Sequence, residues 1–197
     1  MTEPRQLFPM MLDLAGRRCL VVGAGAVGEG KISGLLAGGA SVVVVAPAAT
    51  EQVLEWARNG TLEYRQKAFQ PDDLEGAFLA VAATSDTELN HHVYAEARRR
   101  QVLCNVVDDP EHCDFFYPAI VRRGALQIAI STSGISPAFA RSLRQTLEAQ
   151  FGEEYAAWLE EAARRRQEIL RTVADPAERR RLLEELAASS PLSHRKD

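Results

Sequence analysis

Short apolar segments alternate with longer amphipathic ones over the first half of the chain. The apolar segments are rich in β-branched residues, which is typical of strands buried in a parallel sheet. They predict strands at residues 18–22, 41–45, 78–82 and 102–107, and the alternating segment 62–66 predicts one more. Helices are predicted at residues 26–38, 50–59 and 87–100, with a short helical piece after the turn at 71–73. Val27, Leu35 and Leu36 are available for the buried face of the first helix. Because parallel strands need crossover connections, this order predicts an α/β fold with a Rossmann-like, doubly wound parallel sheet.

The pattern changes after Pro110. Residues 115–121 and 126–131 predict two strands, and residues 122–124 between them predict a hairpin turn. Ser136 is a good N-cap and Pro137 suits a first helical position, so a helix is expected to begin there. Two further helices are predicted, at residues 153–173 and from residue 176, and the polar tail 189–197 is expected to be frayed.

The composition narrows the class of protein. The 197 residues carry 23 basic and 27 acidic side chains, and the net charge of −4 argues against nucleic acid as a partner. Three cysteines are too few, and odd in number, for a secreted disulfide framework. No apolar run approaches the ~18 residues of a membrane span, and acidic residues and prolines interrupt the start where a signal peptide is apolar. We therefore expect a cytoplasmic protein with no membrane partner.

Residues 23–28 match the pattern G-x-G-x-x-G between a predicted strand and a predicted helix. Gly23 allows a tight turn, Gly25 lets the backbone approach a pyrophosphate, and Gly28 lets helix and strand pack closely. The start of the helix offers unpaired N–H groups and a positive dipole end to that anion. The pattern therefore predicts dinucleotide binding; the alternative is a glycine turn in an ordinary β–α unit with nothing bound.

One part of the dinucleotide motif is missing. An acidic residue that binds the ribose is expected ~20 residues past the loop, but the nearest acid there is Glu51. No arginine or lysine stands in that region to hold a 2′-phosphate either, so this rule does not decide between NAD and NADP. Backbone groups of Pro47 and Ala48 are expected to meet the ribose instead.

Four segments carry a resemblance to a known family: residues 19–27 with Lys31, 80–84, 104–110 and 130–138. In order and spacing they resemble the precorrin-2 dehydrogenase module of siroheme synthases, some members of which are also sirohydrochlorin ferrochelatases. The resemblance covers residues 12–147, and the helical remainder is similar only in character. Since no methyltransferase domain follows, we expect the free-standing form of this module.

The resemblance implies an NAD-dependent oxidation of precorrin-2, a partly reduced tetrapyrrole, to sirohydrochlorin in siroheme biosynthesis. It leaves open whether ferrous iron is a further substrate. The cofactor residues that we assign on this basis are Gly23, Gly25, Ala26, Val27, Gly28, Pro47, Ala48 and Thr84. The substrate residues that we assign are Asn105, Ser131, Ser133 and Gly134, and the family's key carboxylate falls on Asp108.

Asp108 follows the last predicted parallel strand, and ligand sites of open α/β sheets lie at the carboxyl ends of the strands. A carboxylate there can take the proton that leaves the macrocycle as a hydride leaves to the nicotinamide. It can equally orient pyrrole nitrogens or accept their protons during metal insertion. The alternative is a turn in which Asp108 caps the step to Asp109 and Pro110.

The histidines predict no metal site. Glu111 to Asp114 are four potential ligands in a row, and neighbouring side chains diverge too far to share one ion. We interpret this segment as a loop, in which His112 is a distant candidate for a role in metal insertion. His91 and His92 lie in a predicted helix and are interpreted as helix surface.

The hydroxyl-rich residues 131–134 precede the helix that begins at Ser136, and such a loop can bind carboxylates. Precorrin-2 carries acetate and propionate arms, so this loop is a candidate to hold them. Four arginines are further candidates, with a solvated face or ion pairs between subunits as the alternative: Arg122, Arg123, Arg141 and Arg144.

These patterns predict three domains: an NAD-binding Rossmann domain at 1–112, a dimerisation domain of hairpin and helix at 113–150, and a helical C-terminal domain at 151–197. The last two have a thin core of their own, from which we infer a homodimer. Two alternatives to the dehydrogenase remain open. One is a non-catalytic nucleotide-sensing module, and the other is a different small-molecule NAD-dependent dehydrogenase on the same fold.

Overall fold

The computed structural model describes residues 6–194. The chain divides into two compact units, one formed by Phe8–Phe116 and the other by the chain from Tyr117 onward together with the described residues that precede Phe8. None of the described helices is long and apolar enough to cross a membrane. The predicted division into three domains stays a prediction.

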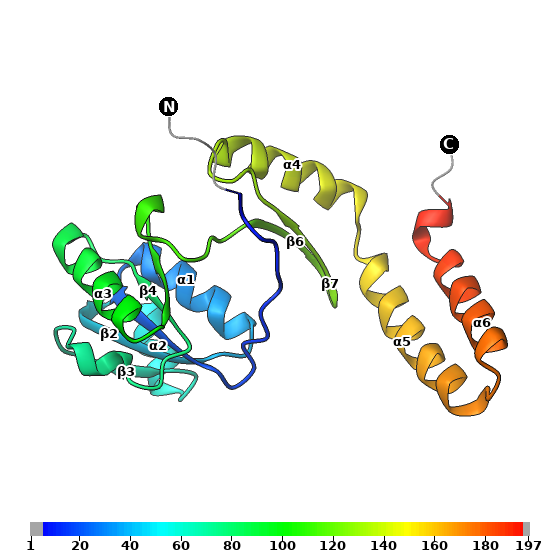
Figure 1. The fold of residues 1–197 in the computed structure, drawn as a ribbon, viewed down its shortest axis with the longest axis horizontal. Coiled ribbons are helices and arrows are strands. Elements are labelled where there is room, and N and C mark those ends of the chain that lie inside the picture. Colours follow the sequence, from blue (N-terminus) through cyan, green and yellow to red (C-terminus); the bar gives the residue numbers. More distant parts are fainter. Residues whose placement is uncertain (1–5, 195–197) are drawn as a thin grey trace. The chain divides into compact units, whose positions relative to one another are not determined.

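The first unit contains a five-stranded sheet in which every neighbouring pair of strands is parallel, in the order β3-β2-β1-β4-β5 (Figure 1). Its strands are β1 (Arg18–Ala24), β2 (Ser41–Ala49), β3 (Glu63–Arg65), β4 (Leu79–Ala82) and β5 (Leu103–Val106). Its helices are α1 (Ala26–Ala37), α2 (Glu51–Arg58) and α3 (Thr87–Arg99), with short 3₁₀ turns η1 (Pro71–Leu74) and η2 (Pro110–His112). This is the doubly wound sheet that the alternating pattern predicted, and the prediction of fold class is confirmed.

Alternate residues of each central strand point to opposite faces of the sheet and form two buried clusters. Val21 and Val44 belong to a cluster that includes residues of α1 and α2. Leu20 and Val45 belong to a second cluster, which includes residues of α3. Each fully buried aliphatic side chain of this kind stabilises the fold by about 1.5–3 kcal/mol, so burial on both faces holds the strands in a fixed register.

The strand order reverses between β1 and β4. The chain runs outward from β1 through β2 to β3, then returns to add β4 and β5 on the other side of β1. In open α/β sheets this switch point leaves a crevice outside the carboxyl ends of the strands, where ligands bind. The loops after β1, β4 and β5 are therefore the expected site.

The first helix differs from the prediction at Val27, which is 54% exposed rather than buried. Its buried face is formed by Gly28, Ile32 and Leu35. These residues are spaced by four and three positions and share one side of a helix, whereas Val27 precedes that stripe by one residue. The exposure of Val27 matters for function because it leaves an apolar side chain accessible within the glycine loop, residues 23–28.

The second unit begins with an antiparallel hairpin, β6 (Ala119–Arg123) and β7 (Leu126–Ile130). It continues with α4 (Pro137–Gln150), α5 (Glu154–Thr172), α6 (Pro176–Ala188) and a final 3₁₀ turn η3 (Pro191–His194). The predicted helix start is confirmed, since the Ser136 hydroxyl accepts a hydrogen bond from the Phe139 N–H at 3.2 Å. Within the predicted frayed tail, η3 is ordered into a turn, and residues 195–197 lie outside the described residues.

Two boundaries of the hairpin differ from the prediction. Arg122 and Arg123 belong to β6 rather than to the turn, which lies at Gly124 with a left-handed φ of +56°. The first strand begins at Ala119 instead of residue 115. Pro118 has no N–H for a ladder, and the carbonyl of Phe115 accepts a hydrogen bond from Asn105 in β5.

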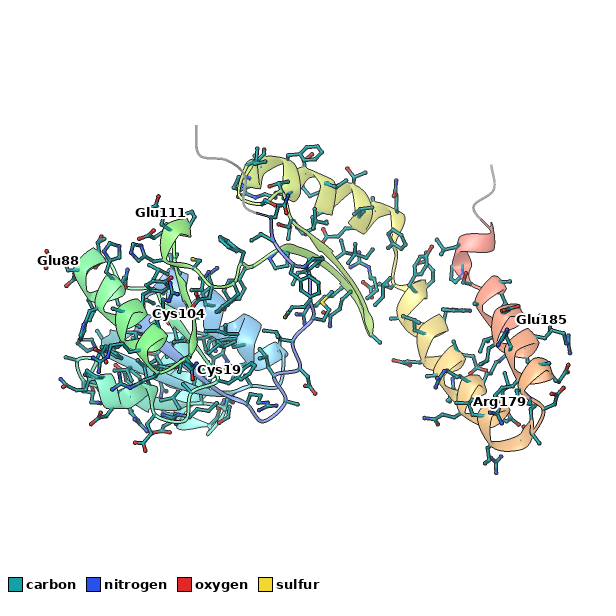
Figure 2. All side chains as sticks on the ribbon, in the orientation of Figure 1. Cys19, Glu88, Cys104, Glu111, Arg179 and Glu185 are labelled. Atoms are coloured by element: carbon teal, nitrogen blue, oxygen red, sulfur yellow. The ribbon has the colours of Figure 1, made fainter. Side chains whose placement is uncertain are left out.

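The cysteines form no disulfide in the described structure. Cys19 and Cys104 lie inside the first unit (Figure 2). Burial raises the pKa of Cys19 to about 11, and burial together with the charge of Asp114 raises the pKa of Cys104 to about 12. Both thiols are therefore protonated near neutral pH and act as small apolar core groups.

Candidate active site

Two of the three loop glycines are required by the fold itself. Gly23 has a left-handed φ of +101°, and a Cβ there would lie 2.5 Å from the carbonyl oxygen of Ala83, after β4. A Cβ on Gly28 would lie 2.3 Å from the carbonyl oxygen of Gly23. The turn after β1 is thus packed directly against the turn after β4, which places the glycine loop at the switch point of the sheet.

Gly25 is different, because a Cβ there would meet nothing within 4 Å. It precedes α1 in an extended conformation, with φ −76°, and offers no side chain to cap the first turn. Gly25, Ala26 and Val27 are all exposed. The start of α1 is therefore open to solvent. The first N–H groups of a helix have no partner within the helix, so these residues fit the pyrophosphate of a dinucleotide.

Pro47 and Ala48 lie at the exposed carboxyl end of β2. There β2 extends past an irregularity in its pairing with β1, between Val22 and Ala24, beside the glycine loop. The nearest acid, Glu51, forms an ion pair with Arg58 in the same helix. The site thus offers a ribose the backbone around Pro47 and Ala48 instead of a carboxylate at the end of β2.

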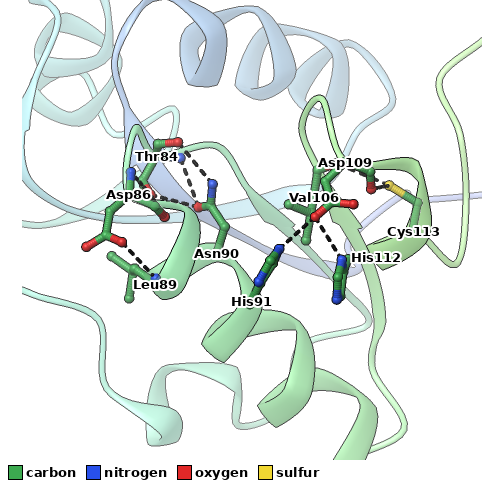
Figure 3. Close-up of polar contacts among 9 residues, drawn as sticks. All are labelled: Thr84, Asp86, Leu89, Asn90, His91, Val106, Asp109, His112 and Cys113. Carbon is green, nitrogen blue, oxygen red and sulfur yellow. Dashed lines mark hydrogen bonds and ion pairs between the residues drawn. The ribbon is translucent and has the colours of Figure 1, made fainter.

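Thr84 lies in the loop after β4, where its polar atoms are engaged within the protein (Figure 3). Its hydroxyl lies 2.7 Å from Oδ1 of Asn90 and accepts a hydrogen bond from the Asp86 N–H at 3.1 Å. Asn90, on α3, also donates to the Thr84 carbonyl at 3.0 Å. This network fixes the loop that contacts Gly23, so Thr84 has a structural role in the site. The contact of Thr84 with the cofactor stays a prediction.

Asp108 lies just past the carboxyl end of β5 in a left-handed conformation, with φ +61°. Its side chain is exposed, and no described residue forms a hydrogen bond or ion pair with its carboxylate. Burial lowers the pKa of Lys31 on α1, while the negative charge of Asp108 acts to raise it. Asp108 is therefore within electrostatic reach of the helix that carries the glycine loop.

Asn105 is buried in β5, and its amide holds the following loop in place. It donates to the Phe115 carbonyl at 2.8 Å and to Sγ of Cys113 at 3.2 Å. Cys113 in turn donates to the carbonyl of Val106. The side chain of Asn105 thus fixes the loop that presents Asp108, and its predicted contact with substrate stays a prediction.

Two known protein families match successive parts of this chain. A family described as "Putative NAD(P)-binding" matches residues 10–119, and one described as "Sirohaem biosynthesis protein central" matches residues 123–150. The solved structure of SirC, a precorrin-2 dehydrogenase, has 30% sequence identity and a TM-score of 0.82, over 96% of this chain and 96% of that chain. This chain belongs to the precorrin-2 dehydrogenase family.

Curated relatives are longer proteins. A siroheme synthase of Photorhabdus laumondii is 38% identical over 178 residues, which is 90% of this chain and 38% of that protein. A siroheme synthase of Nitrosococcus oceani is 38% identical over 185 residues, which is 94% of this chain and 40% of that protein. The chain thus spans about two fifths of the length of the curated relatives it matches.

In this member of the precorrin-2 dehydrogenase family, the second unit carries the other predicted substrate residues. Ser133 and Gly134 both have a left-handed backbone, with φ of +51° and +82°. The Ser131 hydroxyl accepts a hydrogen bond from the Ser133 N–H at 3.1 Å. The three residues form one tight turn before α4, and they belong to the unit from Tyr117 onward, whereas the glycine loop belongs to the unit of Phe8–Phe116.

Two of the four candidate arginines have partners within their own unit. Arg123 donates to the Glu148 carbonyl at 3.0 Å and lies 3.4 Å from the Glu153 carboxylate. Arg144 forms an ion pair with Glu148 one turn further along α4. Arg123 and Arg144 therefore have structural roles, and the carboxylate-binding role that the sequence allowed them is left without an observation in its favour.

Sequence reasoning missed a cluster formed by His91, Asp109 and His112. His91 Nε2 lies 2.7 Å and His112 Nδ1 lies 2.8 Å from the same Asp109 oxygen, Oδ2 (Figure 3). Burial acts to raise the pKa of Asp109, but the hydrogen bonds from both histidines outweigh it and hold that pKa below its ordinary value. His91 lies on the surface of α3 with its side chain 42% exposed, as interpreted, but that interpretation did not include its contact with Asp109. The sequence segment 111–114 could not indicate this cluster, because it contains His112 but neither His91 nor Asp109.

Proposed function

We propose that this protein oxidises precorrin-2 to sirohydrochlorin, with NAD⁺ as the hydride acceptor. The observation that carries the proposal is the position of two features at one edge of one parallel sheet. The open glycine loop follows β1, and the exposed carboxylate of Asp108 follows β5, two strands away. Membership in the precorrin-2 dehydrogenase family supports the choice of substrate.

The reaction removes two hydrogens from the macrocycle, one as a hydride and one as a proton. When bound, NAD⁺ supplies the hydride acceptor, and the products are NADH and a proton besides sirohydrochlorin. In this proposal the first turn of α1 and the backbone at Gly25 bind the pyrophosphate. Pro47 and Ala48 meet the ribose through their backbone.

The proton needs an acceptor within hydrogen-bond reach, and Asp108 is the residue that we propose for it. Its carboxylate is exposed, and no hydrogen bond from the described residues occupies it. Lys31 on α1 lies within electrostatic reach of the same carboxylate. Asp108 can also orient the substrate by accepting hydrogen bonds from pyrrole nitrogens.

The second unit completes the proposal. The turn at Ser131, Ser133 and Gly134 binds acetate or propionate arms of the substrate through its N–H and hydroxyl groups. A second copy of the chain covers the apolar side chains that α4 and its preceding turn leave exposed, so the working form is a homodimer. Iron insertion is not part of this proposal, because the geometry that favours dehydrogenation does not select it.

The test is Asp108→Asn, assayed with precorrin-2 and NAD⁺ by the appearance of NADH and the spectrum of sirohydrochlorin. Asparagine tolerates the left-handed backbone at this position and removes only the charge. We expect kcat to fall by about 10²–10⁴-fold, the usual contribution of a general base, with the Kd for NAD⁺ unchanged. Glu111→Gln, an exposed acid of the same loop, is the matched control and should retain turnover.

Other outcomes are informative. Wild-type turnover in Asp108→Asn would remove this residue from the mechanism. Wild-type protein that binds NAD⁺ tightly but never oxidises precorrin-2 would instead support a nucleotide-sensing module. Turnover of another reduced small molecule, with precorrin-2 inert, would support a different dehydrogenase on this fold.

A further inference from the structure

Three side chains with metal-binding chemistry meet at the outer edge of the first unit. His91 lies on α3, while Asp109 and His112 lie in the loop that follows β5 (Figure 3). One ligand atom from each lies within 4.8 Å of the other two. They come from segments eighteen residues apart in the sequence, so the cluster depends on the packing of α3 beside β5.

We propose that His91, Asp109 and His112 bind a divalent transition-metal ion through two imidazole nitrogens and one carboxylate oxygen. Imidazole favours ions such as Zn²⁺, Co²⁺, Ni²⁺ and Fe²⁺, whereas Mg²⁺ and Ca²⁺ prefer ligand sets made of oxygen alone. Two histidines and one carboxylate are a common protein ligand set for the first group of ions.

The distances fit such an ion after a small adjustment. The two nitrogens lie 2.7 and 2.8 Å from the carboxylate oxygen, as hydrogen-bonded atoms do. Ligand atoms that each lie ~2.0–2.1 Å from one metal ion are separated from one another by roughly 3 Å. Each nitrogen therefore lies within a few tenths of an ångström of the separation from the carboxylate oxygen that a shared ion requires, and the ion takes the place of the protons of the two hydrogen bonds.

The ring orientations are also suited to a common ion. The rings of His91 and His112 stack with centroids 4.1 Å apart and an interplanar angle of 25°. The Tyr94 ring packs edge-on against His112, with centroids 5.0 Å apart. Both rings direct one nitrogen at the same Asp109 oxygen, and the contact with Tyr94 limits rotation of the His112 ring.

The loop that carries Asp109 is held by internal hydrogen bonds. Cys113 donates from its thiol to the carbonyls of Val106 and Asp109, at 3.1 and 3.2 Å. The N–H of His112 donates to the Asp109 carbonyl at 3.1 Å. Because these bonds involve no ligand atom, the loop keeps its shape whether or not the ion is bound, and little ordering is needed on binding.

The three side chains are accessible to solvent, and they do not fill all the coordination positions of a metal ion. The side chains of His91, Asp109 and His112 are 42%, 26% and 32% exposed. Three protein ligands leave at least one coordination position for water or another molecule, unlike the closed four-ligand sites of structural zinc. We therefore expect an ion that exchanges with solution rather than one that the fold requires.

The experiment uses the full chain without a histidine tag, stripped with a chelator and then titrated with Co²⁺ and with Zn²⁺ in the absence of NAD⁺ and tetrapyrrole. Binding is measured by calorimetry and, for Co²⁺, by the visible d–d absorption that reports nitrogen ligation. We expect one ion per chain at this site. His91→Gln and His112→Gln should each weaken binding by at least about tenfold and abolish the rise in Tm that the ion gives the wild type.

His92→Gln is the matched control, since His92 is the next residue on α3 and packs edge-on against Phe69 instead of entering the cluster. It should leave the Kd for the metal unchanged. Failure of the wild type to bind Co²⁺ or Zn²⁺ stoichiometrically would overturn the proposal and leave a hydrogen-bonded cluster. Equal losses in His91→Gln and His92→Gln would overturn it as well. Neither result bears on precorrin-2 oxidation, because no readout involves turnover.

Discussion

The two units of the chain differ in how completely they bury their own apolar side chains. In the unit of Phe8–Phe116, two clusters cover both faces of the sheet, and most strand residues are fully buried. In the unit from Tyr117 onward, the cluster of buried residues consists of Val121, Ile130 and Ala140, and α6 has no buried residue among those described. The thin core that was expected from the hairpin and amphipathic helices of the second unit agrees with this small cluster.

The difference in burial indicates that the two units have different roles. The first unit can hold loops after β1, β4 and β5 in fixed positions because a doubly covered sheet supports them. The second unit leaves Ile135 and Phe139 at 73% and 60% exposure, next to the turn that we propose as a substrate contact. An apolar surface of this kind is consistent with burial against a second copy of the chain.

The largest expected difference between the two units is in the free energy of unfolding that is lost when one leucine in each unit is truncated to alanine. Leu20 is completely buried in β1, and Leu20→Ala should destabilise the protein by about 3 kcal/mol, because it opens a cavity between strands and helix. Leu143 on α4 is only half-buried, and Leu143→Ala should cost about 1 kcal/mol or less in the isolated chain. Urea unfolding at low protein concentration measures both. Equal costs would show that the second unit has as complete an interior as the first.

The next effect separates ligand binding from folding inside the first unit. Gly25→Val places a branched side chain in open space at the start of α1, without strain in the protein. We expect the Kd for NAD⁺ to rise about a hundredfold, since the side chain occupies the place of the pyrophosphate, while Tm stays unchanged. Titration calorimetry and a thermal melt check this.

Two glycines of the same helix serve as controls for that experiment. Gly30→Ala adds a methyl group that also meets nothing within 4 Å, and it should leave the Kd unchanged. Gly28→Ala, whose methyl group would meet the Gly23 carbonyl, should lower Tm instead. An unchanged NAD⁺ affinity in Gly25→Val would mean that the cofactor binds elsewhere.

The smallest effect contrasts a buried ion pair in the first unit with exposed pairs in the second. Burial acts to raise the pKa of Asp73, but hydrogen bonds from Lys67, from the Gln70 N–H and from Arg65 outweigh it and hold that pKa below 3.8. A lowered folded-state pKa stabilises the protein above the unfolded-state value, and this stabilisation is lost as pH falls through the folded-state value. Asp73→Asn should therefore cost about 2 kcal/mol at pH 7, and the deficit should shrink as the pH falls below about 4.

The control for that prediction is Glu178→Gln on α6, which removes an exposed pair with Arg181. Exposed pairs of this kind contribute little because water screens them, so this variant should unfold like the wild type at both pH 7 and pH 3. A deficit in Asp73→Asn that stays constant from pH 7 to pH 3 would contradict an ionised Asp73 in the folded protein.

Several features of the fold and the site could be predicted from the sequence because they depend on local chain geometry. The glycine pattern predicted the turn after β1, since Gly23 needs a left-handed backbone and Gly28 a close approach. The helix start at Ser136 was predicted because a serine followed by proline satisfies the first turn of a helix. The position of Asp108 after the last parallel strand followed from the alternation of strands and helices.

Other features were decided only by the tertiary structure. His91 joins Asp109 and His112 because α3 packs beside β5. Lys31 comes within electrostatic reach of Asp108 because the loop after β1, which leads into α1, and the loop after β5 lie at the carboxyl ends of one parallel sheet. The exposure of Val27 likewise depends on which side of α1 covers the sheet. Local steric effects and hydrophobic periodicity act over a few residues, so they can be predicted from the sequence. Contacts between distant segments depend instead on the order and packing of the strands.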